Sequence, residues 1–188
     1  MKDYKAQFQD LVNAYIHREG IADLMEYINN SDFFEAPAST RFHGAEPGGL
    51  CQHSIAVGKH LMKLADVYVP GQYTKETLAI VALFHDLCKI RVYTLSTRNV
   101  KDEETGCWRK EPFYKFEEQD KYGGHGAKSV FLVMQFMPLS MEEASAINCH
   151  MGFAGESNIG SISDAYNAYP LAWLLHVADE AATYIDKQ

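Results

Sequence analysis

Apolar residues recur at helical spacing along most of the chain and predict a mainly α-helical protein. Residues 3–16 (DYKAQFQDLVNAYI) and 21–30 (IADLMEYINN) each predict an amphipathic helix. A longer helix is expected from Leu50 to Val69, because Pro70 and Gly71 follow it. Thr74 is a good N-cap for another helix, which we expect to continue through residues 78–89 (LAIVALFHDLCK).

The second half of the chain mixes helical and extended patterns. Residues 91–100 and 107–118 are rich in β-branched and aromatic residues and flank a glycine-containing turn, so they predict a β-hairpin over about 91–118. Residues 152–163 are rich in Gly and Ser and predict a loop. Further helices are expected over 123–137, after the capping box of Ser140 and Glu143, and over 169–186 with Pro170 in its first turn.

The sequence shows no internal repeat and no linker, and its 188 residues suit one domain. We expect that domain to span residues 1–188, with N-terminal helices over 1–32, a core over about 33–182 and the hairpin inserted at about 91–118. It has no run of about 18 apolar residues and no signal-peptide pattern. A cytoplasmic protein without membrane contact is therefore expected.

The formal net charge of −8 disfavours binding of duplex nucleic acid through a broad basic face. One segment has the opposite sign, since residues 89–115 carry seven basic and four acidic residues. A local positive site for a small anionic substrate thus remains compatible with the composition. The four cysteines form no C-x-x-C pair, and we expect free, reduced thiols.

The stretch LFHDLCKI, residues 83–90, places a histidine and an aspartate side by side in an apolar segment. Asp179 lies in a similar stretch, LLHVADEAA. A buried carboxylate is costly unless it is paired or binds a metal ion, and imidazoles with carboxylates suit Mn, Fe, Zn, Ni or Co. His85 and Asp86 can straddle one ion, and other helices would supply further ligands. The candidates are His53, His125, His150 and Asp179.

The order of these residues resembles the HD superfamily of metal-dependent phosphohydrolases. The match is closer to the HD domain of bacterial 3′–5′ exoribonucleases, which carry stretches similar to APASTRFHGAEPGGLCQHS, LFHDLCKI, GGHGAKS, CHMG and LLHVADEA. The resemblance runs from about Phe33 to about Ala182. It implies a single-domain HD-type helical bundle.

The resemblance also implies roles for individual residues, with one or two divalent transition metal ions as cofactors. Asp86 would bridge the two ions, and Lys89 would face the substrate phosphate. His43, in the loop before the glycines, would point toward the site. The first ion would be held by His53, His85, Asp86 and Asp179, and the second by Asp86, His125 and His150.

Several other residues are candidates for contact with the substrate. Arg91, Arg98 and Arg109, on or near the hairpin, are expected to bind further phosphates, because arginine grips phosphate oxygens in a fork. His176 lies one turn before the last proposed ligand. It either contacts substrate or hydrogen-bonds a ligand carboxylate, and we favour the carboxylate. His60 is expected to be a partly buried structural residue.

Two departures from the exoribonuclease pattern affect the expected substrate. Met151 stands where those enzymes usually have a second histidine, and the chain has no room for their separate OB domain. We therefore expect a nucleotide or a short single-stranded oligonucleotide as substrate. Metal-activated water would hydrolyse its phosphoester bond, with Asp86 and Lys89 as the catalytic residues.

Two other functions remain open at this stage. The ligand order also resembles HD-fold mixed-valence di-iron oxygenases, which use O₂ to cleave C–C or C–P bonds. A non-catalytic HD module that senses a nucleotide is the third possibility. The six polar residues in apolar helices favour a catalytic protein, because a module without turnover need not keep them. The pattern predicts no oligomeric state.

Overall fold

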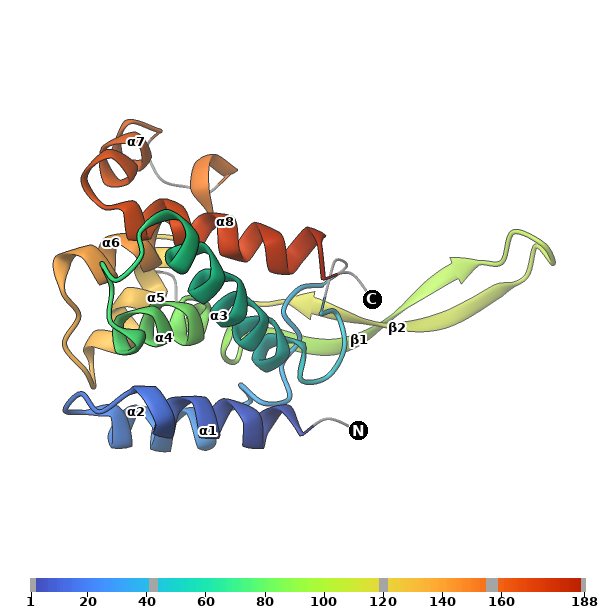
Figure 1. The fold of residues 1–188 in the computed structure, drawn as a ribbon. Helices are drawn as coiled ribbons and strands as arrows, with labels where there is room; N and C mark the ends of the chain where they lie inside the picture. Colours follow the sequence, from blue (N-terminus) through green and yellow to red (C-terminus); the bar gives the residue numbers. More distant parts are fainter. Residues whose placement is uncertain (1–2, 41–43, 119–121, 155–158, 187–188) are drawn as a thin grey trace.

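The computed structural model describes residues 3–40, 44–118, 122–154 and 159–186. These residues form a bundle of α-helices and one antiparallel β-hairpin (Figure 1). The mainly α fold with an inserted hairpin that the sequence predicted is thus confirmed. Within the described ranges, no helix is both long and apolar enough to cross a membrane.

Two N-terminal helices form one side of the bundle (Figure 1). Helix α1 (Tyr4–Tyr15) begins after Asp3, whose side chain accepts a hydrogen bond from the backbone N–H of Ala6 at 3.0 Å. Helix α2 (Ile21–Asn29) follows. The Phe8 ring of α1 is fully buried against other aromatic rings, so burial of an apolar face holds this helix in place.

The centre of the bundle is built from helices that are far apart in the sequence. Helix α3 (Gly49–Tyr68) packs along α8 (Pro170–Tyr184), and α4 (Lys75–Phe84) packs against α3. Helix α6 (Met141–Cys149) packs against α8 and α5 (His125–Met134). Four helices, α3, α4, α6 and α8, therefore meet in one core.

The predicted helix starts are confirmed. The Thr74 side chain accepts a hydrogen bond from the backbone N–H of Thr77 at 3.1 Å. Ser140 and Glu143 form the reciprocal capping box at the start of α6. Pro170 occupies the first turn of α8, where a backbone N–H would have no helical partner.

The end of α4 differs from the prediction. Helix α4 ends at Phe84, and a short 3₁₀ helix, η1 (Leu87–Lys89), follows it. Asp86 lies between them with φ −109° and ψ 21°, outside the α-helical region. The backbone N–H of Cys88 donates to Oγ of Ser129 in α5 at 3.1 Å. This contact with another helix fixes the turn, and the local sequence pattern does not show it.

The loop predicted over residues 152–163 was also partly wrong. A short 3₁₀ helix, η2 (Gly152–Ala154), and helix α7 (Ile159–Ala168) occupy much of this region. Ile162 is buried, and Tyr166 four residues later packs against the core that includes α8. Burial of this face outweighs the weak helix propensity of Gly and Ser, which had favoured a loop.

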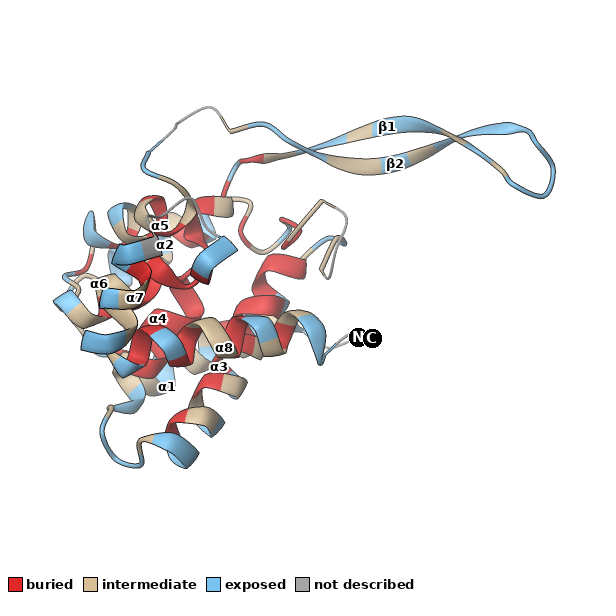
Figure 2. Ribbon diagram, turned by 90° about the horizontal axis from the view of Figure 1, so that it is seen from above, coloured by how far each residue is buried: buried red, intermediate tan, exposed pale blue. Residues whose placement is uncertain are grey.

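The hairpin consists of β1 (Tyr93–Lys101) and β2 (Trp108–Phe116). The strands pair from Tyr93 opposite Phe116 at the base to Lys101 opposite Trp108 near the tip. The hairpin projects from the helical body, and its residues are exposed or only partly buried (Figure 2). It belongs to the chain segment that immediately follows η1.

Candidate metal centre

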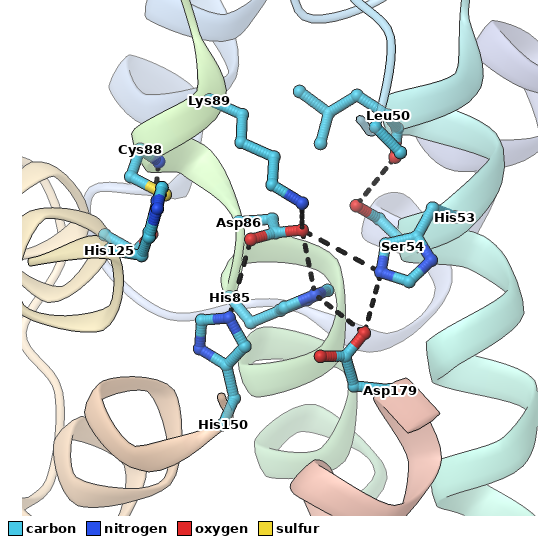
Figure 3. A network of polar contacts seen from close by, with 12 residues as sticks. Leu50, His53, Ser54, His85, Asp86, Cys88, Lys89, His125, His150 and Asp179 are labelled. Atoms are coloured by element: carbon cyan, nitrogen blue, oxygen red, sulfur yellow. Dashed lines mark hydrogen bonds and ion pairs between the residues drawn. The ribbon is translucent and has the colours of Figure 1, made fainter. Parts of the chain in front are cut away.

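Polar side chains from segments far apart in the sequence converge in the core (Figure 3). His85 and His150 are the C-cap residues of α4 and α6, and Asp86 follows His85 in the turn. His53 projects from α3 and Asp179 from the neighbouring α8. All five are buried, with exposed fractions of 5% for His53, 0% for His85, 2% for Asp86, 0% for His150 and 9% for Asp179.

The facing atoms of these side chains are close to one another. Nε2 of His53 lies 2.9 Å from Oδ1 of Asp179 and 3.8 Å from Oδ2 of Asp86. Nε2 of His85 lies 3.3 Å from Oδ2 of Asp86. Nε2 of His150 lies 3.5 Å from the other oxygen of that carboxylate, Oδ1. Asp86 therefore stands at the middle of the cluster, with imidazoles on both sides.

The histidine rings are oriented so that one nitrogen faces the cluster. Nδ1 of His85 donates to the backbone carbonyl of Ala82 at 2.8 Å, and Nδ1 of His150 donates to that of Ile147 at 2.6 Å. With the proton at Nδ1, the Nε2 lone pair of each ring points inward. Both Nε2 atoms, and Oδ1 of Asp86, are buried and make no hydrogen bond within the described residues.

Buried polar atoms without partners are rare, because each costs free energy. A cation in the middle of this cluster would satisfy all of them at once. His53, His85 and Asp86 form one group whose ligand atoms lie within 4.8 Å of one another, and His85, His150 and Asp179 form another. Imidazole nitrogens with carboxylate oxygens suit a divalent transition metal ion. The residues therefore fit such an ion.

The charges in the cluster are also fixed by their surroundings. Burial raises the pKa of Asp86, but the ammonium of Lys89 and the ring of His85 outweigh burial and hold that pKa well below its usual range. Burial opposes ionisation of Asp179 as well, and the hydrogen bond from His53 lowers its pKa below the ordinary value. Both carboxylates are therefore anionic at neutral pH and ready to bind a cation.

Lys89 lies at the edge of the cluster, as the sequence led us to expect. Its Nζ donates to Oδ2 of Asp86 at 2.6 Å (Figure 3). Burial lowers the pKa of Lys89, but the neighbouring carboxylate raises it above its usual value, so the ammonium stays charged. The Lys89 side chain as a whole is 16% exposed. The 3₁₀ turn creates this pair, since residues three apart lie on one side of it.

The structure places His125 beside this cluster instead of within it. His125 is the first residue of α5, and its Nδ1 lies 3.6 Å from Sγ of Cys88. Its ring centroid lies 6.1 Å from that of Phe116 at the base of the hairpin. Among the described residues, His125 belongs to neither group of clustered ligand atoms. Its role as ligand to a second ion stays a prediction.

Within the described part of the chain, His176 hydrogen-bonds the backbone of a proposed ligand, whereas we had favoured a ligand carboxylate. Its Nδ1 donates to the backbone carbonyl of His150 at 2.8 Å, and its ring stacks on Tyr166. Gly152, with φ 56°, passes so close to this ring that an added Cβ would lie 2.5 Å from it. His43 lies outside the described residues.

The three arginines expected to bind phosphate make other contacts. The Arg91 guanidinium lies over the ring of Tyr27 and donates to the carbonyl of Asn30 in the connection after α2. Arg98 and Arg109 both pair with Glu111 on the hairpin, at 4.0 Å and 2.8 Å. The structure therefore does not bring these three side chains to the cluster.

Tyr93 is a residue near the site that the sequence did not indicate. It is the first residue of β1, and its hydroxyl donates to the carbonyl of Ala38 at 3.4 Å. Burial raises the pKa of Tyr93, and its ring contacts that of Phe116, which in turn lies against His125. The only sequence signal for this position near the site was that Tyr93 follows Lys89 by four residues.

The buried cysteines are small core residues, as expected. Cys51, Cys88 and Cys149 are buried, and none belongs to a group of clustered ligand atoms in the described part of the chain. Burial raises the pKa of both the Cys51 and the Cys88 thiols to about 12. These thiols are therefore protonated at neutral pH, and thiolate ligation has no support.

The ligand order, the helices that carry it and the buried cluster define an HD-type metal centre. Residues 50–183 match the family model of the HD domain, which covers most of the chain. The protein therefore belongs to the HD domain family, a superfamily of metal-dependent phosphohydrolases. Comparison with curated proteins and with solved structures gave no match.

Proposed function

We propose that this protein is a metal-dependent phosphohydrolase that acts on a nucleotide or a short single-stranded oligonucleotide. One observation carries the proposal. A permanently charged ammonium, that of Lys89, lies 2.6 Å from the central carboxylate of a buried His/Asp cluster that fits a divalent ion. Two sources of positive charge at one edge of a site suit an anionic phosphate.

The chain's own residues divide the work. One divalent transition metal ion, Mn, Fe, Ni, Co or Zn, would be held by the five clustered side chains, His53, His85, Asp86, His150 and Asp179. When bound, such an ion lowers the pKa of a coordinated water toward about 7 and neutralises phosphate oxygens. Five clustered ligands support one ion, and a second ion would draw on His125.

Lys89 would stabilise the negative charge that develops on the phosphate oxygens. A fixed charge is most effective where burial excludes water, because it needs no reorganisation during the reaction. Asp86 positions this ammonium by accepting its hydrogen bond. The buried imidazoles keep water out of the inner side of the cluster.

The substrate class rests on the resemblance to the HD domain of 3′–5′ exoribonucleases and on local charge. Residues 89–115 carry seven basic and four acidic residues in a chain of net charge −8. Met151 in place of a second histidine favours a small or short substrate over a long RNA. A cytoplasmic location fits this substrate and remains a prediction.

Asp86→Asn is the direct test. This change keeps the side-chain shape but removes the central negative charge, so we expect bound Mn and hydrolysis of nucleotides and bis(p-nitrophenyl) phosphate to fall together by more than about 100-fold. Metal content per chain and turnover over a panel of Mn, Co, Ni and Mg measure both effects. Asp186→Asn is the matched control, because Asp186 is 45% exposed and pairs with His60.

Full turnover by the Asp86→Asn variant contradicts the proposal. Two irons per purified chain, O₂ uptake and no phosphatase activity would instead identify an oxygenase. Failure of the wild-type protein to bind any of the metals would identify the non-catalytic module.

A further inference from the structure

The two faces of the β1–β2 hairpin differ in chemistry. Strand pairing places five cross-strand pairs on one face, which we call the aromatic face. From base to tip these pairs are Tyr93 with Phe116, Leu95 with Tyr114, Thr97 with Pro112, Asn99 with Lys110, and Lys101 with Trp108. The ring contacts of Tyr93 with Phe116 and with Tyr114, at 5.8 and 6.4 Å, confirm that these rings share one side.

The opposite face is neutralised by its own ion pairs. Arg98 and Arg109 flank Glu111 and pair with it, Arg109 also pairs with Asp102, and Lys115 pairs with Glu117. Arg98 also lies over the ring of Phe113. On the aromatic face, Lys101 and Lys110 have no carboxylate partner within the described residues, and none of the ten paired residues of that face is acidic. The free positive charge of the hairpin therefore lies on the aromatic face.

Large apolar side chains on the aromatic face are open to solvent. Trp108 and Leu95 are each 69% exposed, and Phe116 is 42% exposed. The hairpin projects away from the helices, so the distal half of this face has no cover from the body (Figures 1 and 2). Two isolated strands are marginally stable in water, so exposed aromatic rings at this position call for a functional reason.

The aromatic face begins at the candidate metal centre. At its base the ring of Tyr93 contacts that of Phe116, which in turn lies against the ring of His125 beside the cluster, with centroids 6.1 Å apart. From there, nine residues of strand extend roughly 30 Å at about 3.3 Å per residue. A chain of aromatic rings and free lysines thus leads from the phosphate-binding edge of the centre outward.

We propose that the aromatic face binds single-stranded nucleic acid and guides one end of it to the metal centre. Bases stack on aromatic rings with little sequence preference, and lysines on the same face bind the phosphates. The inference rests on the proposed phosphohydrolase function and specifies its substrate as a strand of several nucleotides. We call this proposed binding surface the track. Its outer part is formed by Trp108, Lys101 and Lys110.

The test compares charge-matched variants on the two faces of the metal-loaded protein. Fluorescence anisotropy measures binding of a labelled single-stranded oligonucleotide of about 12 nucleotides. We expect Trp108→Ala to weaken binding about tenfold through loss of base stacking. The double variant Lys101→Gln/Lys110→Gln should flatten the slope of log K against log salt by about 1.4, at about 0.7 per phosphate contact. Arg98→Gln/Arg109→Gln removes the same charge from the other face and should leave affinity within twofold.

Hydrolysis of a dinucleotide, which is too short to reach the outer track, separates this inference from the proposed function. Variants on the aromatic face should lower the ratio of oligonucleotide to dinucleotide hydrolysis about tenfold. If the wild-type protein cleaves the dinucleotide but binds the oligonucleotide no better than Trp108→Ala does, the proposed track is wrong. The proposed phosphohydrolase function is then unaffected. Binding on this face without any hydrolysis overturns the function and supports the track.

Two other results overturn the track. Equal losses in the two double variants would show that net charge alone attracts the strand. A dimer in analytical ultracentrifugation that Trp108→Ala converts to monomer would show that the aromatic face is a contact between two copies of the chain.

Discussion

At the scale of single residues, the same local arrangement orients both buried histidines at helix ends. His85 and His150 each end a helix, and each donates Nδ1–H to the carbonyl three residues earlier. That bond fixes the proton on Nδ1 and aims Nε2 at Asp86. The local backbone, and not the opposing carboxylate, therefore sets which ring nitrogen can bind a metal.

His176 acts on one of these histidines through its backbone, which makes it a positioning residue. We expect His176→Ala to lower metal affinity about tenfold, because the carbonyl of His150 loses its donor and the ring shifts. Competition with a chromogenic chelator measures the affinity, and partial rescue by His176→Asn would identify the missing donor. His60→Ala is the control, since the His60 ring pairs with Asp186. Equal metal affinity in His176→Ala and wild type would rule out this role.

At the scale of elements, one buried ion pair joins the N-terminal helices to the core. Arg18, in the connection between α1 and α2, donates to both carboxylate oxygens of Glu143 at 2.6 and 2.9 Å. The Glu143 side chain is only 2% exposed and also caps the N-terminus of α6. Burial raises the pKa of Glu143, but the hydrogen bonds from Arg18 outweigh it and lower this pKa.

This pair predicts a pH-dependent stability. A lowered folded-state pKa stabilises the protein above the unfolded pKa of about 4.3, and the contribution disappears as pH falls through the folded value. We expect Glu143→Gln to lower the free energy of unfolding by about 2 kcal/mol at pH 7. The difference from wild type should vanish as the pH is taken well below about 4.

Urea unfolding at several pH values measures this difference. Glu19→Gln, at an exposed position next to Arg18, is the control and should change little at any pH. A Glu143→Gln deficit that is the same at acidic and neutral pH would show that packing, and not the ion pair, is responsible.

At the scale of the whole molecule, the candidate metal centre links helices that the chain visits far apart. His53 comes from α3, His85 and Asp86 from the end of α4, His150 from the end of α6, and Asp179 from α8. An ion bound to all of them would act as a cross-link of the folded state. Unfolding would have to release it.

Metal removal should therefore destabilise the protein as a whole. At a free Mn concentration about 100 times its Kd, binding contributes about 2.7 kcal/mol to the free energy of unfolding. For a chain of this length that raises Tm by about 5 to 10 °C over the chelated protein. Differential scanning fluorimetry with and without chelator measures the shift, and Asp86→Asn should show none. If chelator leaves the Tm of the wild-type protein unchanged, the metal ion does not stabilise the folded state.

The sequence alone determined most of the helices, three of their starts and the hairpin, because periodicity, capping residues and turn residues are local signals. The sequence also predicted the buried cluster, because His85, Asp86 and Asp179 are polar residues within apolar stretches. Helix α7 was missed, because it is stabilised by packing on α8, where Tyr166 stacks on His176. Local propensity carries no information about that contact.

Only the tertiary structure decided which of the proposed residues meet. It gathered His53, His85, Asp86, His150 and Asp179 into one cluster and set His125 against Cys88. It paired Arg98 and Arg109 with Glu111 and placed Lys101 and Lys110 on the other face, with no carboxylate partner among the described residues, because strand register fixes which side chains share a side. Distances between segments depend on how the helices pack and how the strands pair, and neither is encoded in the spacing of residues along one segment.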